Sequence, residues 1–203
     1  MPATPPSRTC LTNAVVELRP ITPDDAAGLF AALDFPEVWV SGFGGGPAGR
    51  PRDVAAMARF VTSHLTAGSG GVAYAVRRAD DGALVGTSTL GDVDLGNQTV
   101  HLGWTAYTPA VWGTAVNPGT KLALLTHAFE DCGFGRVRLQ VDHLNTRSQA
   151  AVAKLGAVRE GVARRHKRRA DGTWRDSVMF SILAGEWPAV RARLEDRVAG
   201  QTA

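Results

Sequence analysis

A strand-like run over residues 100–107 passes through a loop of small residues into an amphipathic helix, and this junction most constrains the fold. The loop reads Trp112, Gly113, Thr114, Ala115, Val116, Asn117, Pro118 and Gly119. Small side chains let main-chain N–H groups approach an anion, and the first turn of the helix adds unpaired donors and a partial positive charge. The junction predicts a phosphate-binding loop, although similar loops also make tight turns without a ligand.

Length and composition favour one globular domain. The chain has 203 residues, of which 44% are hydrophobic and 20% are charged, and this length can bury a core. No apolar run approaches the about 20 residues that a membrane-spanning helix needs. The first residues lack the apolar centre of a secretion signal. We expect a flexible tail over residues 1–13, one domain over residues 14–198, no membrane partner and a cytoplasmic location.

The cysteines and charges favour neither a metal site nor a nucleic-acid partner. Cys10 and Cys132 are the only cysteines, and their positions give no disulfide framework and no metal-ligand spacing. The net charge is +3, with its excess in the basic run from Arg164 to Arg169. No aromatic residue alternates with these charges to stack bases. We interpret the run as a solvated strand or hairpin, with polyanion binding as the less favoured alternative.

The order of the expected elements indicates an α+β fold. Apolar alternation and turn sequences predict strands over residues 15–19, 72–77, 84–90, 99–107 and 136–141, and a hairpin that turns at Asp171 and Gly172. Caps and apolar periodicity predict helices after Thr22, from residue 52 or 53 to 64, from an N-cap at Asn117, over 146–155 and over 187–198. An early helical pair, a meander and one strand–helix–strand crossover give a mostly antiparallel mixed sheet. The glycine-rich loop over residues 41–52 is either a mobile cover for a substrate site or a plain connection.

Three segments follow one another along the chain: Pro109-Ala110-Val111-Trp112-Gly113, Asn145-x-x-Ser148 and Lys154-Leu155-Gly156-Ala157-Val158-Arg159-Glu160-Gly161. Together they resemble the GNAT acetyltransferases. Their order and separation are more specific than any one segment. The resemblance runs from about Val15 to about Leu194 and is strongest to the RimJ/RimL type, the ribosomal-protein N-terminal acetyltransferases.

The resemblance implies a three-layer α/β/α fold whose sheet is splayed where acetyl-CoA binds. It places the pyrophosphate on the loop and helix start, and the pantetheine arm along the end of the strand over residues 99–107. The implied cofactor-binding residues are Thr105 and Tyr107 through main-chain groups, Asn145 at the pantetheine amide, and Trp112, Gly113, Thr114, Ala115, Val116 and Asn117 in the loop.

The loop departs from the family pattern Gln/Arg-x-x-Gly-x-Gly/Ala. Trp112 stands first, Ala115 and Asn117 replace glycines, and Pro118 removes an N–H donor. Lys121 is expected to compensate beside the diphosphate, because a cation becomes favourable there once the anion is bound; an exposed surface charge is the alternative. Arg147 and Lys154 are candidates for the adenosine phosphate or are plain exposed helix charges.

Acetyl transfer to an amine needs a neutral amine, a polarised carbonyl and a proton for the departing thiolate. We expect direct attack, because neither cysteine stands beside a base. His101 is the candidate base, because family members frequently carry Glu there and a histidine pKa of about 6.5 suits removal of a proton from the amine. A histidine that only packs in the core is equally consistent with the sequence. His143 is a lesser candidate for the base. Ser148 matches the position that donates a proton toward the CoA sulfur, with a bound water as its rival.

The predicted function is transfer of an acetyl group from acetyl-CoA to a primary amine, either a protein N-terminus, a lysine or a small amine. The RimJ/RimL resemblance favours a protein α-amine. A non-catalytic acyl-CoA-binding regulatory module is the alternative, because the loop is altered and His101 stands where relatives have Glu. Candidates for the acceptor pocket, or for ordinary core packing, are Trp39, Phe43, Trp104 and Trp174. No metal is expected, and a homodimer stays open.

Overall fold

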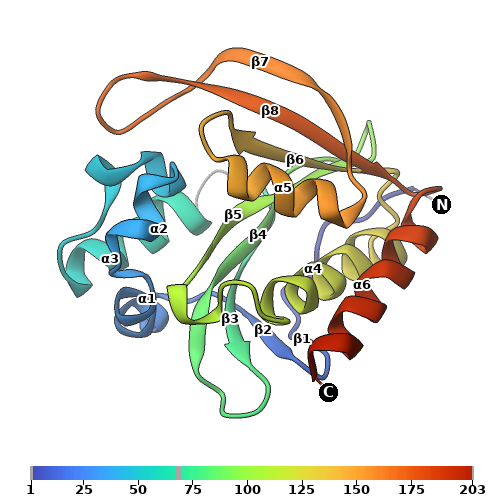
Figure 1. Cartoon of the computed structure of the whole chain (residues 1–203), viewed down its shortest axis with the longest axis horizontal. Coiled ribbons are helices and arrows are strands. Elements are labelled where there is room, and N and C mark those ends of the chain that lie inside the picture. The colour runs from blue at the N-terminus through green and yellow to red at the C-terminus, as the bar shows by residue number, and fades with distance from the viewer. Residues whose placement is uncertain (1, 67–69, 203) are drawn as a thin grey trace.

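The computed structural model describes residues 2–66 and 70–202, and its central feature is one sheet with helices on both faces (Figure 1). Within these residues the sheet has eight strands in the order β1-β2-β3-β4-β5-β6-β8-β7. The strands are β1 (Leu11–Thr12), β2 (Val16–Pro20), β3 (Val72–Arg78), β4 (Leu84–Asp94), β5 (Thr99–Tyr107), β6 (Arg136–Asp142), β7 (Val158–Arg168) and β8 (Trp174–Leu183). The predicted α+β class with a mostly antiparallel mixed sheet is confirmed.

The sheet opens between its two central strands. β5 ends the antiparallel meander that starts at β1, and β6 runs parallel to it after a helical crossover. The two strands pair only from Thr99 opposite Arg136 to His101 opposite Arg138, although both continue beyond this point. Their facing edges therefore diverge and leave main-chain groups accessible to a ligand.

Helices cover both faces of the sheet, which gives the predicted three layers (Figure 1). One face packs against α4 (Val116–Thr126), α5 (Thr146–Leu155) and α6 (Trp187–Thr202), and the other packs against α1 (Ala26–Leu33), α2 (Pro36–Val40) and α3 (Val54–Phe60). Each helix contributes an apolar stripe to one of two separate cores, as Leu124 and Val190 do on one face and Leu29 and Trp39 on the other.

The helix after the small-residue loop begins two residues before the expected position. α4 starts at Val116, so Asn117 and Pro118 lie in its first turn and Asn117 is not the N-cap. The N–H of Val116 instead donates to Thr114 Oγ1 at 3.3 Å. Proline is tolerated at this position because the first N–H groups of a helix have no intrahelical acceptor.

Residues 2–13 run along the domain, which differs from the expected free tail. Leu11–Thr12 pair with β2 as β1, the N–H of Thr4 donates to the carbonyl of Cys132 at 2.8 Å, and Ala3 is buried. The short strand β1 and the short helix α2 were both absent from the sequence prediction. Proline can either end a helix or occupy its first position. Pro36 begins α2, whereas the sequence indicated only the end of the preceding helix. In the described part of the chain, no helix has the length and apolar character needed to cross a membrane.

Candidate active site

A cavity of about 560 Å³ lies where β5 and β6 separate. One end lies beside the loop before α4 and the start of α5, and the other lies beneath residues 41–45 and the β7–β8 hairpin. The cavity brings together nine predicted site residues: His101, Thr105, Tyr107, Trp112, Gly113, Asn117, Lys121, Asn145 and Ser148. The other three are not among its lining residues. Ala115 and Val116 are buried, and the hydroxyl of Thr114 donates to the carbonyl of Val111 at 2.7 Å.

Trp112 fastens the loop to the end of β5. Its indole N–H donates to the carbonyl of Tyr107 at 3.0 Å, and the guanidinium of Arg147 lies 3.6 Å from the indole centroid. Gly113 has a φ of 80°, the left-handed region that favours glycine. This end of the cavity thus combines a tight loop, a helix start and a cation, which suits an anion.

Lys121 lies in the core below β5, which corrects its expected place beside a diphosphate. Its Nζ donates to Thr105 Oγ1 at 2.8 Å and to Ser88 Oγ at 3.4 Å. Burial lowers the pKa of Lys121 to about 7. Because α4 begins at Val116, Lys121 falls in the second turn, where it reaches the sheet instead of the helix start.

His101 is buried, and its ring nitrogens have no hydrogen-bond partner within the described chain. Burial, with smaller effects from Lys167 and Arg138, lowers the pKa of His101 to about 3. The Nδ1 atom lies 3.5 Å from Asp92 Oδ2 without forming a hydrogen bond. The ordinary pKa assumed from the sequence therefore does not hold. At neutral pH the ring is uncharged and has one donor and one acceptor for a ligand.

A bulge in β5 shapes the cavity beside His101. Between Thr87 and Thr89 of β4, β5 has one extra residue. Trp104 lies at this bulge with a φ of 44°, a strained conformation for a bulky residue. Its ring centroid lies 4.9 Å from that of His101. A Cβ atom at Gly103 would overlap the His101 ring, so this packing needs glycine.

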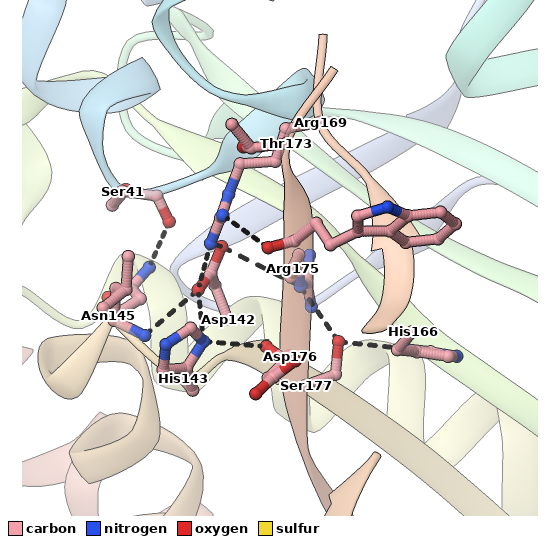
Figure 2. A network of polar contacts seen from close by, with 12 residues as sticks. Ser41, Asp142, His143, Asn145, His166, Arg169, Thr173, Arg175, Asp176 and Ser177 are labelled. Carbon is pink, nitrogen blue, oxygen red and sulfur yellow. Dashed lines mark hydrogen bonds and ion pairs between the residues drawn. The ribbon is translucent and has the colours of Figure 1, made fainter. Parts of the chain in front are cut away.

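Asn145 caps α5 and connects it to the glycine-rich loop. Its Oδ1 accepts the N–H of Ser148 at 2.9 Å. Its Nδ2 donates to the carbonyl of Ser41 at 3.1 Å (Figure 2). The predicted cap is confirmed, and both ends of the amide are engaged. The side chain of Ser148 lines the cavity.

Asp142 lines the opposite end of the cavity and lies at the centre of a network of polar contacts (Figure 2). Its oxygens accept from Arg169 Nη2 at 3.0 and 2.8 Å, and Arg175 Nε lies 4.0 Å away. The N–H of Ala170 donates to the carbonyl of Gly45 at 3.0 Å. The β7–β8 hairpin thus holds the glycine-rich loop over the cavity.

The predicted acceptor-pocket aromatics separate into three groups. Phe43 and Trp104 line the cavity, Trp39 is a core residue whose indole N–H donates to the carbonyl of Leu33 at 2.7 Å, and Trp174 is exposed. His143 is exposed and is not among the lining residues. The basic run does form part of a hairpin, but Lys167, Arg168 and Arg169 line the cavity, a role that sequence reasoning missed.

A family model described as an acetyltransferase (GNAT) domain matches residues 16–158, most of the chain. The chain belongs to the GNAT acetyltransferase family. This confirms the predicted family, whose members transfer acetyl groups from acetyl-CoA to amines. The GNAT chain is 31% identical over 108 residues to a Bacillus subtilis (strain 168) protein named "Putative ribosomal N-acetyltransferase YdaF". The match covers 53% of this chain and 57% of the Bacillus subtilis protein. This chain therefore spans little more than half the length of that curated relative.

Solved structures extend the similarity over nearly the whole GNAT chain. A "putative acetyltransferase" from T. thermophilus is 33% identical with a TM-score of 0.82, covering 98% of this chain and 100% of that one. RimJ of Mycobacterium smegmatis, solved in complex with CoA-disulfide, shares the fold at 23% identity and a TM-score of 0.75, covering 97% of each chain.

Proposed function

We propose that this chain transfers an acetyl group from acetyl-CoA to a primary amine by direct attack. One observation carries the proposal: a single cavity joins the open edges of β5 and β6 to a second end lined by His101 and Trp104. The first end suits a phosphate-bearing cofactor arm and the second suits an acceptor. RimJ of Mycobacterium smegmatis, which shares the fold, was solved with CoA-disulfide bound, and this supports a CoA thioester as the ligand.

Three features would hold acetyl-CoA, which supplies the acetyl thioester. The loop at Trp112 and Gly113 and the first turn of α4 face the phosphates, with Arg147 as the partnering cation. The main chain of β5 beyond His101 offers its open edge to the pantetheine amides. Asn145 contributes by fixing the start of α5 through its cap.

The acceptor end favours an uncharged amine. Its lining residues include the cations Lys167, Arg169 and Arg175, and the carboxylate of Asp142 is already paired with Arg169. Positive surroundings and burial both disfavour an ammonium group, so bound amines lose a proton more readily. Neutral His101 then acts as a hydrogen-bond partner that orients the amine, and bulk water takes the proton.

The departing thiolate needs a proton, and Ser148 is the proposed donor. It lies at the start of α5 on the cavity wall, where the first-turn N–H groups also stabilise developing negative charge. The alternative function, a non-catalytic acyl-CoA-binding module, draws support from the low pKa of His101, because the imidazole then does not take a proton from the amine at neutral pH.

A panel of amines separates the two functions. Purified protein is mixed with acetyl-CoA and peptides with free N-termini, lysine derivatives or small amines, and CoA release is measured. We expect turnover with at least one class, and the relative named as a ribosomal N-acetyltransferase favours peptide N-termini. Tight acetyl-CoA binding without turnover on any amine would support the binding module instead. Ser148→Ala should lower kcat about tenfold with little change in the KM for acetyl-CoA.

A further inference from the structure

We infer that the amine acceptor carries a carboxylate and that Lys167 binds it. The inference rests on the proposed acetyltransferase function and names the substrate class of the same cavity. It starts from an asymmetry of charge at the acceptor end, where basic side chains of the β7–β8 hairpin line the cavity and Asp142 is the only acidic lining residue among the described residues.

The negative charge of Asp142 is already paired with cations of the β7–β8 hairpin. Both of its oxygens accept from Arg169, and Oδ1 also accepts the N–H of Leu144 at 3.0 Å. Arg175 is likewise engaged, because it donates to Ser177 Oγ at 3.0 Å and to the carbonyl of Gln140 at 3.2 Å. The ion pair of Asp142 and Arg169 therefore serves as scaffold, and the acceptor end keeps a net positive charge.

Lys167 differs from these neighbours because its ammonium has no carboxylate within 4 Å in the described part of the chain. Its Nζ lies 5.2 Å from the ring centroid of Trp104, over the indole face. The side chain is half-buried and lines the cavity. Burial has the larger effect on the pKa of Lys167 and lowers it, whereas the negative charge of Asp92 raises it. A partly desolvated cation without a counter-ion is a ready partner for an anionic ligand group.

A bulge places Lys167 in the cavity. From Ala163 opposite Ser177 to Lys167 opposite Arg175, β7 advances four residues while β8 advances two. Arg165 within the bulge has a φ of 50°, a strained conformation for a non-glycine residue. In a regular register Arg165 would stand opposite Arg175, and the two extra residues give this position to Lys167, whose ammonium lies over Trp104.

Trp104 connects Lys167 to the expected position of the reacting amine. Its ring contacts His101, whose two buried nitrogens lack partners in the described chain. An acceptor lying across the Trp104 ring can therefore place its amine at His101 and its carboxylate at Lys167. This geometry selects amines that carry an acidic group a few bonds away, which includes acidic residues near a peptide N-terminus and small amino acids.

Matched acceptors test the inference. In the peptide arm, serine-aspartate and serine-asparagine tetrapeptide amides differ by one charge; in the small-molecule arm, β-alanine is compared with β-alaninamide. We expect the carboxylate member of at least one pair to have a kcat/KM about tenfold higher. Lys167→Gln should abolish the preference, Lys167→Arg should retain it, and Arg164→Gln, which removes an exposed charge of the same strand, should leave it unchanged.

Direct binding supplies a readout independent of turnover. Calorimetry on the CoA-loaded protein should detect the carboxylate acceptor with wild type and Arg164→Gln but not with Lys167→Gln, whose CoA affinity stays at the wild-type value. Turnover of neutral amines without any carboxylate preference, or an equal loss for both members of a pair in Lys167→Gln, would overturn the inference while leaving the acetyltransferase function intact. Absence of turnover with every amine would instead refute the proposed function, and the binding measurement would still decide the role of Lys167.

Discussion

The Nζ atom of Lys121 lies 2.8 Å from Thr105 Oγ1. This amino group, which is normally solvated, is therefore buried in the core between α4 and β5. Thr105 Oγ1 also lies 2.8 Å from Ser88 Oγ. The two hydroxyls can therefore bond to each other without the lysine, and the amino group is dispensable for satisfying them.

Replacing Lys121 with Met should stabilise the protein more at pH 6 than at pH 9. Burial lowers the pKa of Lys121 to about 7, against about 10.4 in the unfolded chain. The cost of burying its charge is absent above the unfolded value, grows as the pH falls and is complete below the folded value. The gain in unfolding free energy of Lys121→Met over wild type should rise by about 2 kcal/mol between pH 9 and pH 6, measured by urea unfolding. A gain that is constant with pH would contradict this.

His101 should not contribute to the pH dependence of the reaction. With a pKa of about 3 it stays neutral from pH 5.5 to 9, so kcat/KM in wild type and in His101→Asn should follow the same pH profile. We expect kcat to fall about tenfold in the variant, because an orienting hydrogen bond is weakened. A limb near pH 6.5 that is present in wild type and missing in His101→Asn would show instead that the histidine is the base.

The best-predicted elements are those with strong local signals. β5 and α5 have the expected bounds because turn residues precede the strand, Asn145 caps the helix, and Gly156, with a φ of 92°, ends it. Nine of the twelve site residues named from the sequence line the cavity, and their roles toward acetyl-CoA and the acceptor stay predictions.

The residues that were misplaced depend on irregular backbone or on tertiary packing. Lys121 was expected beside an anion because the start of α4 was placed two residues late. Lys167 looked solvated because it lies in a run of charged residues, and nothing in that run indicates the two-residue bulge that places it opposite Arg175. The pKa of His101 depends on burial by segments far away in sequence, which local patterns do not report.

Gly103→Ala should destabilise the protein by about 2 kcal/mol or more, because the added methyl group meets the His101 ring. Thermal and urea unfolding measure the loss. The same change in a His101→Ala background should cost much less, since the obstructing ring is gone. A double-mutant cycle that is additive would show that the two residues do not contact each other.

Arg147→Gln should weaken CoA binding about tenfold and leave the binding of short acetyl-pantetheine thioesters unchanged. The guanidinium lies against Trp112 at the phosphate end of the cavity, and only CoA carries phosphates. Lys154→Gln removes a charge from the same helix at an exposed position that is not among the lining residues, and serves as the control. Equal losses for both ligands would place Arg147 away from the phosphates.

Asn145 joins two functions that different substitutions can separate. Asn145→Ala removes both the cap of α5 and the bond to Ser41, so it should lower stability by about 1 kcal/mol and raise the KM for the acceptor by releasing the loop at residues 41–45. Asn145→Asp keeps a cap acceptor for the N–H of Ser148 but has no donor for the Ser41 carbonyl. It should therefore regain most of the stability, measured by thermal unfolding, while the acceptor KM stays high. Recovery of both properties in Asn145→Asp would mean that the cap alone positions the loop.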